Sequence, residues 1–314
     1  MTTPVQTTKP PRCPGGDHTY ALSDRERVAE RLLTASERHS FDPRVDVRWD
    51  LPADPDLFYF PPTAVSLYET SLWDRMTHRE RVELSRHESA SVAYMGIWFE
   101  VILMQLLTRH IYDLDLTSRH VAYGLTEIGD ECRHSTMFGR LIDTLDTPRY
   151  HPSPSVQRRG RLLKTVVGPG AAFGAVLIVE ELLDAIQRVT FPDEDVQPFV
   201  RDVTRIHVIE EARHVKYARE ELKRQVARCN AAQLEAIRWV LAETAYTVAR
   251  NLVHLRCYAE AGLDPRTARR VASESPHRRA TIAWAGRRMI RFFDSLGLVR
   301  GPSTTLWRSG GFLP

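Results

Sequence analysis

Cysteine is scarce in this chain, and its spacing excludes a fold held together by disulfides. The sequence of 314 residues contains four cysteines, and no two of them form a Cys-x-x-Cys pair. Small secreted scaffolds need a dense set of cysteines, and structural zinc sites need closely spaced pairs. The sequence therefore predicts reduced thiols and a cytoplasmic protein. The cysteines are Cys13, Cys132, Cys229 and Cys257.

Long hydrophobic runs and an excess of one charge are also missing. The two most apolar runs, 92–107 and 171–178, are short for a membrane span and are interrupted by Glu or Gly. The net charge is +3, and the arginines are interleaved with acidic residues as on solvated helix faces. We therefore expect no membrane insertion and no nucleic-acid partner.

The chain has no sustained period-two alternation, so strands should be few or absent. It also has no Gly-x-Gly-x-x-Gly at the start of a helix, which argues against a flavin or nicotinamide site. We expect an all-α protein with disorder over 1–20, a single domain over 21–300 and a loop-like tail over 301–314. The expected helices cover 23–39, 64–74, 78–112, 117–145, 171–189, 196–229, 231–261, 265–273 and 277–296, with a short one from about 156.

Several boundaries have a local chemical signal. Ser23 is an expected N-cap with Glu26 at the capping-box position. Gly262 and Gly297 are expected C-caps, since glycine readily takes the left-handed conformation that ends many helices.

One motif occurs twice. The segments Asp130-Glu131-Cys132-Arg133-His134 and Glu210-Glu211-Ala212-Arg213-His214 share the pattern acidic-Glu-x-Arg-His. Each follows a glutamate in an apolar run at the same distance, because 131 − 100 = 31 and 211 − 180 = 31. A Glu and a Glu-x-x-His, used twice, form the ligand set of a carboxylate-bridged dinuclear metal site in a four-helix bundle.

The equal spacing has a simple geometric meaning. The midpoint between Glu100 and Glu131 falls in the expected turn 113–116, and the midpoint between Glu180 and Glu211 falls in the expected turn 191–195. Residues equally far from the turn of a helical hairpin lie at the same height. Each hairpin should therefore present two carboxylates and one imidazole to the bundle core.

Burial supports this interpretation. Glu100 is the only charged residue in 92–107, and Glu180 follows the apolar run 173–179. A buried carboxylate must be neutralised, paired or bound to a cation. Glu181 is the local alternative to Glu180, and Glu88 is the alternative to Glu100, although its surroundings look solvated.

His207 adds a third imidazole, because it precedes Glu211 by four residues and His214 by seven. Three imidazoles and four carboxylates favour iron, with manganese as a possible substitute, over calcium or structural zinc. The remaining histidines, His110 and His120 among them, lack ligand-like spacing, and we expect them to be surface or ordinary polar residues.

The other members of the repeat suggest a supporting role. Asp130 and Glu210 are expected to accept hydrogen bonds from the metal-bound imidazole of the opposite hairpin. Arg133 and Arg213 are expected to anchor these two carboxylates.

On these residues the chain resembles the p-aminobenzoate N-oxygenase family. The resemblance rests on Glu100, Glu131-x-x-His134, Glu180 and His207-x-x-x-Glu211-x-x-His214 over most of residues 60–300, and the extra histidine is its most specific part. It implies a ferritin-like four-helix bundle with additional N- and C-terminal helices, two iron ions and O2 as co-substrate. It also implies oxidation of an amine through hydroxylamine and nitroso stages in natural-product (antibiotic) biosynthesis, and a homodimer.

Substrate and partners are less constrained. The expected face around Glu100 carries Met95 and Leu103 and no cation, so we expect a small-molecule or carrier-bound amine that needs no cation beside the metals. Electrons would come from a ferredoxin or a reductase. The alternatives are a C–H hydroxylase or desaturase with the same centre, and a metal-binding bundle without turnover.

Overall fold

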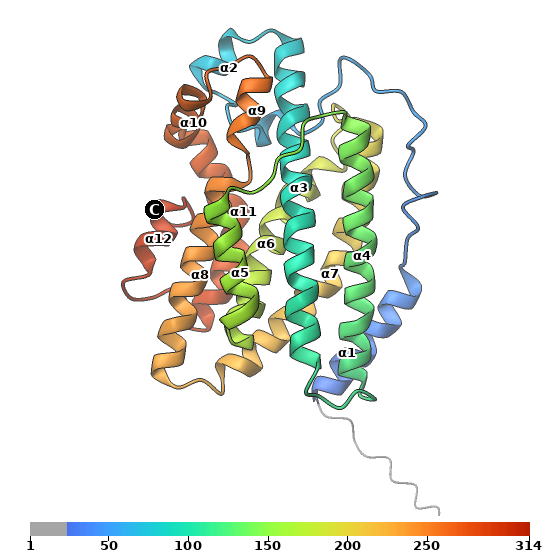
Figure 1. Cartoon of the computed structure of the whole chain (residues 1–314), viewed down its shortest axis with the longest axis vertical. Coiled ribbons are helices and arrows are strands. Elements are labelled where there is room, and N and C mark those ends of the chain that lie inside the picture. Colours follow the sequence, from blue (N-terminus) through green and yellow to red (C-terminus); the bar gives the residue numbers. More distant parts are fainter. Residues whose placement is uncertain (1–23) are drawn as a thin grey trace, which may run out of the picture.

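The computed structural model describes residues 24–314, and four long helices form its centre (Figure 1). These are α3 (His78–Ile111), α4 (Arg119–Leu145), α6 (Pro169–Thr190) and α7 (Pro198–Val226). Helices α3 and α4 form one hairpin and α6 and α7 the other. Within the described residues there is no β-strand, only an isolated bridge between Phe58 and Val196. The predicted all-α, ferritin-like bundle is confirmed.

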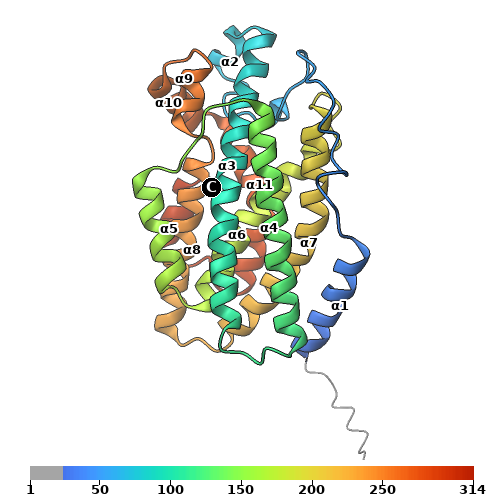
Figure 2. The same cartoon turned by 45° about the vertical axis from the view of Figure 1, so that its right-hand side comes forward.

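The other helices surround this bundle. Helix α1 packs on α4 and α7, and helices α8 and α11 pack on α6, so that the second hairpin is covered on its outer side (Figure 2). Helix α5 lies against α3. The bounds are α1 Asp24–Arg38, η1 Pro62–Ala64, α2 Ser71–Arg75, α5 Pro154–Val166, α8 Ala231–Asn251, α9 Leu255–Glu260, α10 Pro265–Glu274, α11 Pro276–Ser295 and α12 Thr304–Ser309.

Side-chain caps set the start of the bundle helices. Thr77 and Glu80 form a capping box at the start of α3, and the Ser118 hydroxyl accepts a hydrogen bond from the Val121 amide at the start of α4. Gly262 and Gly297 have φ angles of 75° and 70°, so both predicted C-cap glycines take the left-handed conformation. The expected cap at Ser23 and the expected disorder over 1–20 lie outside the described residues.

The expected single helix over 231–261 is wrong, because the chain breaks between α8 and α9. The buried hydroxyl of Ser91 on α3 donates to the Leu252 carbonyl at 2.9 Å and accepts from the His254 amide at 2.9 Å. These bonds replace helical ones at the break, and the His254 ring then caps α9. A contact from a distant helix therefore ends α8, without any local helix breaker.

The expected loop-like tail over 301–314 is also wrong. It contains α12, in which Trp307 is fully buried and packs against Phe293 and Phe312. Trp307 and Phe312 are a sequence signal for burial, since large aromatic side chains contribute much apolar area to a core.

The expected helix over 64–74 is reduced to α2, and the start of α2 is capped by Thr70.

Helix α3 is long and apolar enough to cross a membrane by length and composition alone. In the structure 61% of its most apolar stretch is buried inside the protein. The core helix of a soluble protein passes the same test of length and composition.

Candidate metal centre

The two copies of the repeated motif meet in the middle of the bundle. His214 Nδ1 lies 2.9 Å from Glu131 Oε1 and 2.9 Å from Glu211 Oε1. His134 Nδ1 lies 3.0 Å from Glu131 Oε2 and 3.5 Å from Glu211 Oε1. Helices α4 and α7 thus each contribute a Glu and a His, one turn apart on the same face, to one compact group.

The other three candidates join this group. His207 Nε2 lies 3.5 Å from Glu100 Oε1 and 3.7 Å from Glu211 Oε1. Glu180, His207 and Glu211 offer atoms that lie within 4.8 Å of one another. None of the seven candidate ligands is more than 3% exposed. The structure therefore brings all seven together in one buried cluster.

The two alternative glutamates lie elsewhere. The Glu181 carboxylate is bound by the Arg219 guanidinium, with Nε donating to Oε1 at 2.8 Å. Glu88 is completely buried, so the expectation that its surroundings are solvated is wrong; its carboxylate accepts hydrogen bonds from the amide and the hydroxyl of Ser66. Neither side chain belongs to the cluster, because each has its own partner.

Unsatisfied polar atoms test whether metal ions fit here. Among residues 24–314, buried atoms without a hydrogen-bond partner include one carboxylate oxygen each on Glu100, Glu180 and Glu211, and Nε2 of His207. Leaving such groups unpaired is costly, and most buried polar atoms in proteins are satisfied. These atoms are also ligand atoms for divalent cations. The donor set therefore fits two metal ions, which these seven side chains would hold.

The pKa values of the cluster indicate that its carboxylates lack compensating positive charge. Burial raises the pKa of Glu100 and Glu180 well above the usual range, and the neighbouring carboxylates raise it further. Burial also favours neutral His134, but hydrogen bonds to Glu131 and Glu210 outweigh it and raise the pKa of His134 to about 9. Protons thus balance the carboxylates in the protein alone, and bound metal ions would replace them.

The carboxylates beside the cluster bind the far side of each imidazole. His134 Nε2 lies 2.8 Å from Glu210 Oε2, and His214 Nε2 lies 3.1 Å from Asp130 Oδ2. Each contact crosses from one hairpin to the other, as the pattern leads one to expect. It leaves Nδ1 of both rings directed at the cluster.

Two arginines hold these carboxylates in place. Arg133 donates to Asp130 at 2.6 Å and to Glu210 at 3.1 Å. Arg213 donates to Asp130 at 3.2 Å and also to the carbonyl of His39. The four supporting residues thus form a charged layer that ties α4 to α7 on one side of the cluster.

Sequence reasoning did not identify two residues of this site. The Gln187 side-chain oxygen lies 2.7 Å from His207 Nδ1, which leaves His207 Nε2 to face the cluster. Glu127 is buried one turn before Glu131, and burial raises its pKa well above the usual range. Both stand at helical spacing from a candidate ligand, seven residues after Glu180 and four before Glu131, and this spacing is the signal that could have found them.

A second histidine cluster has a different character. His110, His120 and Glu221 lie close enough to hold an ion, and His120 is buried, so of the two expected roles, surface or ordinary polar residue, only the second remains for His120. However, Arg25 donates to Glu221 at 2.8 Å and Arg224 donates at 2.9 Å. The two guanidiniums already neutralise the carboxylate, so this cluster works as a hydrogen-bonded network between α1, α3, α4 and α7.

Two adjoining apolar cavities, which we call the apolar route, lie between the surface and the metal cluster. The outer cavity, of about 260 Å³ between α3, α5 and α8, shares Phe99, Ile102 and Leu163 with a small void, and the void is lined by Glu180. Trp98 and Phe99, which are both partly buried, line the outer cavity of this route. At Gly160, α5 approaches α3 so closely that a Cβ would lie 2.5 Å from the Trp98 ring.

Curated relatives with a similar sequence exist in mycobacteria. Uncharacterized proteins of Mycobacterium tuberculosis and Mycobacterium bovis are each 30% identical to this chain over 221 residues. The alignment covers 66% of this chain and 64% of each relative, so the chain spans less than two thirds of the length of these relatives.

Among solved structures, two mutants of the R2-like ligand-binding oxidase with an aerobically reconstituted Mn/Fe cofactor are similar to the chain. The valine-to-leucine mutant has a TM-score of 0.45 and 12% identity, and the match covers 87% of this chain and 92% of that chain. The valine-to-isoleucine mutant has a TM-score of 0.43 and 13% identity, and the match covers 92% of each chain.

A family model described as p-aminobenzoate N-oxygenase AurF matches residues 22–297. The match includes the four bundle helices and all seven residues of the buried cluster. The chain therefore belongs to the p-aminobenzoate N-oxygenase AurF family, which its sequence resembles.

Proposed function

We propose that this protein is a non-haem diiron monooxygenase that uses O2 to oxidise the nitrogen of an amine. Family membership supports a diiron oxygenase in general. The single observation that carries the proposal is the convergence of four glutamates and three histidines in one buried cluster with unsatisfied ligand atoms. Two iron ions held there, or manganese in place of iron, would supply the binding and reductive activation of O2.

The protein's own contribution is to hold and shield this chemistry. The cross-hairpin contacts of Asp130 and Glu210 hold the rings of His214 and His134, while Gln187 holds His207. Fixed ligands and a largely dry interior keep the site in one geometry and exclude bulk water. His207 adds a nitrogen ligand on one side of the cluster and so makes its two halves chemically unequal.

The apolar route suggests what kind of amine reaches the site. Among residues 24–314, no lysine or arginine lines the small void beside Glu180, and Arg159, which lines the outer cavity, is paired with Glu243 at 3.0 Å. A carboxylate next to the reacting nitrogen would therefore find no cation. We infer an amine with an apolar body, either free or carried by another protein, whose nitrogen enters first.

The proposed function also includes an electron donor, an oligomeric state and a biological setting. A ferredoxin or a reductase would supply electrons, and the chain would work as a cytoplasmic homodimer in natural-product or antibiotic biosynthesis. The described cysteines Cys132, Cys229 and Cys257 are free thiols, which is compatible with a reducing compartment.

The test is turnover of iron-loaded, chemically reduced protein with O2 and a panel of primary aryl and alkyl amines, analysed by mass spectrometry. We expect products with oxygen on nitrogen, from hydroxylamine to nitro compounds, and none from a Glu211→Gln variant. Oxygen on carbon, or loss of two hydrogens, would instead identify a C–H hydroxylase or desaturase. O2 consumption without any organic product would identify a metal-binding bundle without turnover.

A further inference from the structure

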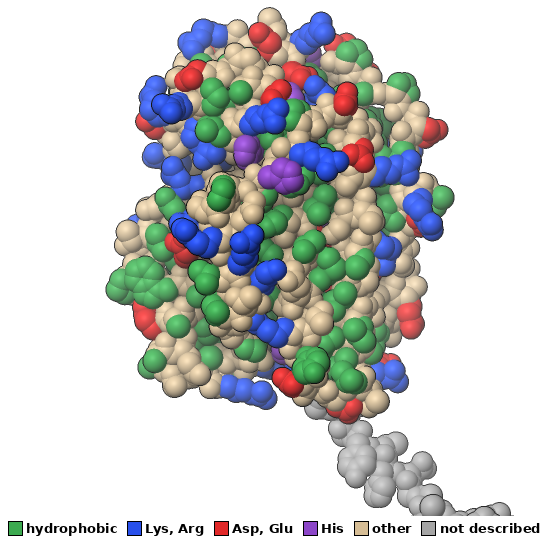
Figure 3. All heavy atoms as spheres, in the orientation of Figure 1, with side chains coloured by type: hydrophobic (Ala, Val, Ile, Leu, Met, Phe, Trp, Pro, Cys, Tyr) green, Lys and Arg blue, Asp and Glu red, His purple; other side chains and the backbone are tan. Residues whose placement is uncertain are grey.

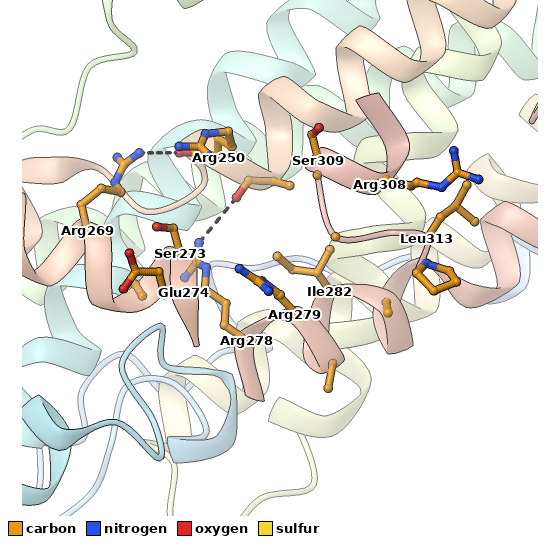
Figure 4. A pocket seen from close by; sticks show the side chains of 17 residues that line it. Arg250, Arg269, Ser273, Glu274, Arg278, Arg279, Ile282, Arg308, Ser309 and Leu313 are labelled. Carbon is orange, nitrogen blue, oxygen red and sulfur yellow. Dashed lines mark hydrogen bonds between the residues drawn. The ribbon is translucent and has the colours of Figure 1, made fainter. Parts of the chain in front are cut away.

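A large cavity at the surface of the protein lies away from the metal cluster. It has a volume of about 730 Å³ and is formed by α8, α10, α11 and the segment around α12 (Figure 4). Five arginines and one glutamate provide its charged lining. In the view of Figure 4, Arg269 and Arg308 stand at opposite ends with Arg279 between them.

The five arginines of this cavity lack acidic partners. Within residues 24–314, none of these five guanidiniums forms an ion pair with a carboxylate, whereas Arg219 and Arg133, for example, are both paired. The glutamate of the lining, Glu274, pairs with Arg270, which does not line the cavity. The five are Arg250, Arg269, Arg278, Arg279 and Arg308.

Three of the five arginines donate side-chain hydrogen bonds, and all of their acceptors are neutral groups. Arg269 donates to the backbone carbonyls of Arg250 and Val253 at 2.8 Å and 3.2 Å. Arg278 donates to the Ala249 carbonyl at 3.5 Å, and Arg308 donates to the Thr304 hydroxyl at 3.3 Å. These contacts position the guanidiniums without neutralising their charge.

The concentration of like charge lowers the proton affinity of one member of the group. Burial lowers the pKa of Arg269, and the neighbouring charges of Arg278 and Arg250 lower it further. Five positive charges face one negative charge, and a carboxylate at Pro314 would still leave an excess of three. An anion in the cavity would relieve this repulsion, and the planar guanidinium suits phosphate oxygens in particular.

We propose that this cavity is a binding site for a ligand bearing a phosphate ester or a pyrophosphate. Several guanidiniums from different helices match a group with several anionic oxygens, and the volume leaves room for an organic part beside the phosphates. The site shares only α8 with the apolar route to the metal cluster. It is therefore independent of the proposed oxygenase activity.

The test is isothermal titration calorimetry of the full chain with pyrophosphate, ADP and adenosine. We expect pyrophosphate and ADP to bind, with affinity that falls as salt is added, and adenosine not to bind. A paired substitution of Arg278→Gln and Arg279→Gln should weaken ADP binding about tenfold or more, because charge-assisted hydrogen bonds are lost.

The chain offers a matched control on the same helix. Arg287 and Arg288 are also adjacent arginines of α11; both are exposed, and neither lines the cavity. Arg287→Gln with Arg288→Gln removes the same charge and should leave ADP binding unchanged. It also controls for ADP taking metal from the protein, since either pair of substitutions leaves the metal cluster intact.

The proposal is overturned if neither pyrophosphate nor ADP binds, if adenosine binds as well as ADP, or if the two double variants weaken binding equally. If the Arg278–Arg279 variant does not fold, Arg279→Gln alone serves, because that exposed side chain has no hydrogen bond or ion pair in residues 24–314. Unchanged ADP affinity in this single variant would count against the proposal. Failure of amine oxidation would leave these results untouched.

Discussion

Each imidazole of the metal cluster is oriented by a polar side chain on its far side. Glu210 faces His134, Asp130 faces His214 and Gln187 faces His207. Such partners select the tautomer and the ring orientation of a metal-binding histidine. They should therefore affect metal affinity even though none of them is itself a candidate ligand.

Substitution of Asp130 measures this effect. In Asp130→Ala the His214 ring loses its acceptor and Arg213 loses a partner, so metal affinity should fall about 10- to 100-fold. Competition with a chelator of known affinity gives the change. Asp143→Ala, an exposed position on the same helix, is the control and should behave as wild type. Full metal occupancy in Asp130→Ala under the same competition would refute this role.

At the scale of single residues, the sequence predicted most of the site. The repeated spacing of 31 residues selected Glu180 over Glu181 and Glu100 over Glu88, and the structure places the two selected residues in the cluster. The 31-residue repeat did not point to Gln187, because this residue lies outside the repeated motif, seven residues after Glu180 on the same face of α6. Its role appears only when α6 and α7 are packed together.

At the scale of elements, α5 is the least buried of the three helices that line the outer cavity of the apolar route. Only Val156 and Gly160 of this helix are buried, and polar contacts fasten the rest. The Arg159–Glu243 pair ties it to α8, and Lys164 binds Gln105 of α3 at 2.9 Å. A helix fastened mainly by surface contacts opens more easily than a core helix.

Narrowing the route beneath α5 should affect substrate use without affecting the metals. Leu162 lines the outer cavity and is 54% exposed, so Leu162→Trp should raise KM for an amine substrate severalfold while metal content stays constant. Leu255→Trp adds the same bulk at an exposed helical position, 38% accessible, that does not line the cavity. Steady-state kinetics compare the two; equal KM values would show that the substrate enters elsewhere.

The hydrogen-bonded network of His110, His120 and Glu221 predicts that the stability of the fold depends on pH. Burial, only partly offset by the charge of Glu221, lowers the pKa of His120 to about 3. In the unfolded chain the ring has its ordinary pKa of about 6.5, so below that pH only the unfolded state gains a proton. Stability is therefore lost as pH falls from about 6.5 towards 3, by up to about 1.4 kcal/mol per unit from this group.

Urea unfolding at about pH 7 and about pH 5 checks this prediction. His120→Gln retains a partner for the Tyr217 hydroxyl but cannot take up the proton, so its stability should fall less between the two pH values. Other buried groups titrate in both proteins and cancel in the comparison. Parallel losses in wild type and variant would show that His120 does not contribute.

The helix boundaries show which features of the fold a sequence pattern can predict. The hairpin helices and their turns were predicted closely, because periodicity and capping are local signals. The break at Leu252 was not, because its cause is Ser91 on another helix. Helix α12 was also missed, because a helix of six residues forms only where Trp307 and Phe312 have a core to enter.

At the scale of the whole molecule, one face is unusually apolar. Val101 of α3 and Leu125 of α4 are 45% and 55% exposed, and hydrophobic side chains gather over the lower half of this face in Figure 3. Exposed apolar patches of this kind favour association between copies of a protein. This face is therefore our candidate for the proposed homodimer interface.

Light scattering after size-exclusion chromatography tests the dimer. We expect a dimer for the wild type and a monomer for Val101→Asp with Leu125→Asp, since buried unpaired carboxylates oppose association. Val45→Asp, at a 77% exposed position before the bundle, should remain dimeric. A wild-type protein that is monomeric at every concentration would exclude the homodimer.

The most direct test of the central claim is metal analysis of protein reconstituted with ferrous iron without oxygen. Glu211 is the carboxylate that occurs in two of the three overlapping ligand groups of this cluster, Glu131–His134–Glu211–His214 and Glu180–His207–Glu211, so it would contribute to the binding of both ions. We expect two iron ions per chain in the wild type, two in the control Glu220→Gln on the outer side of α7, and fewer than two in Glu211→Gln. One iron or none in the wild type, or two in Glu211→Gln, would contradict a dinuclear centre.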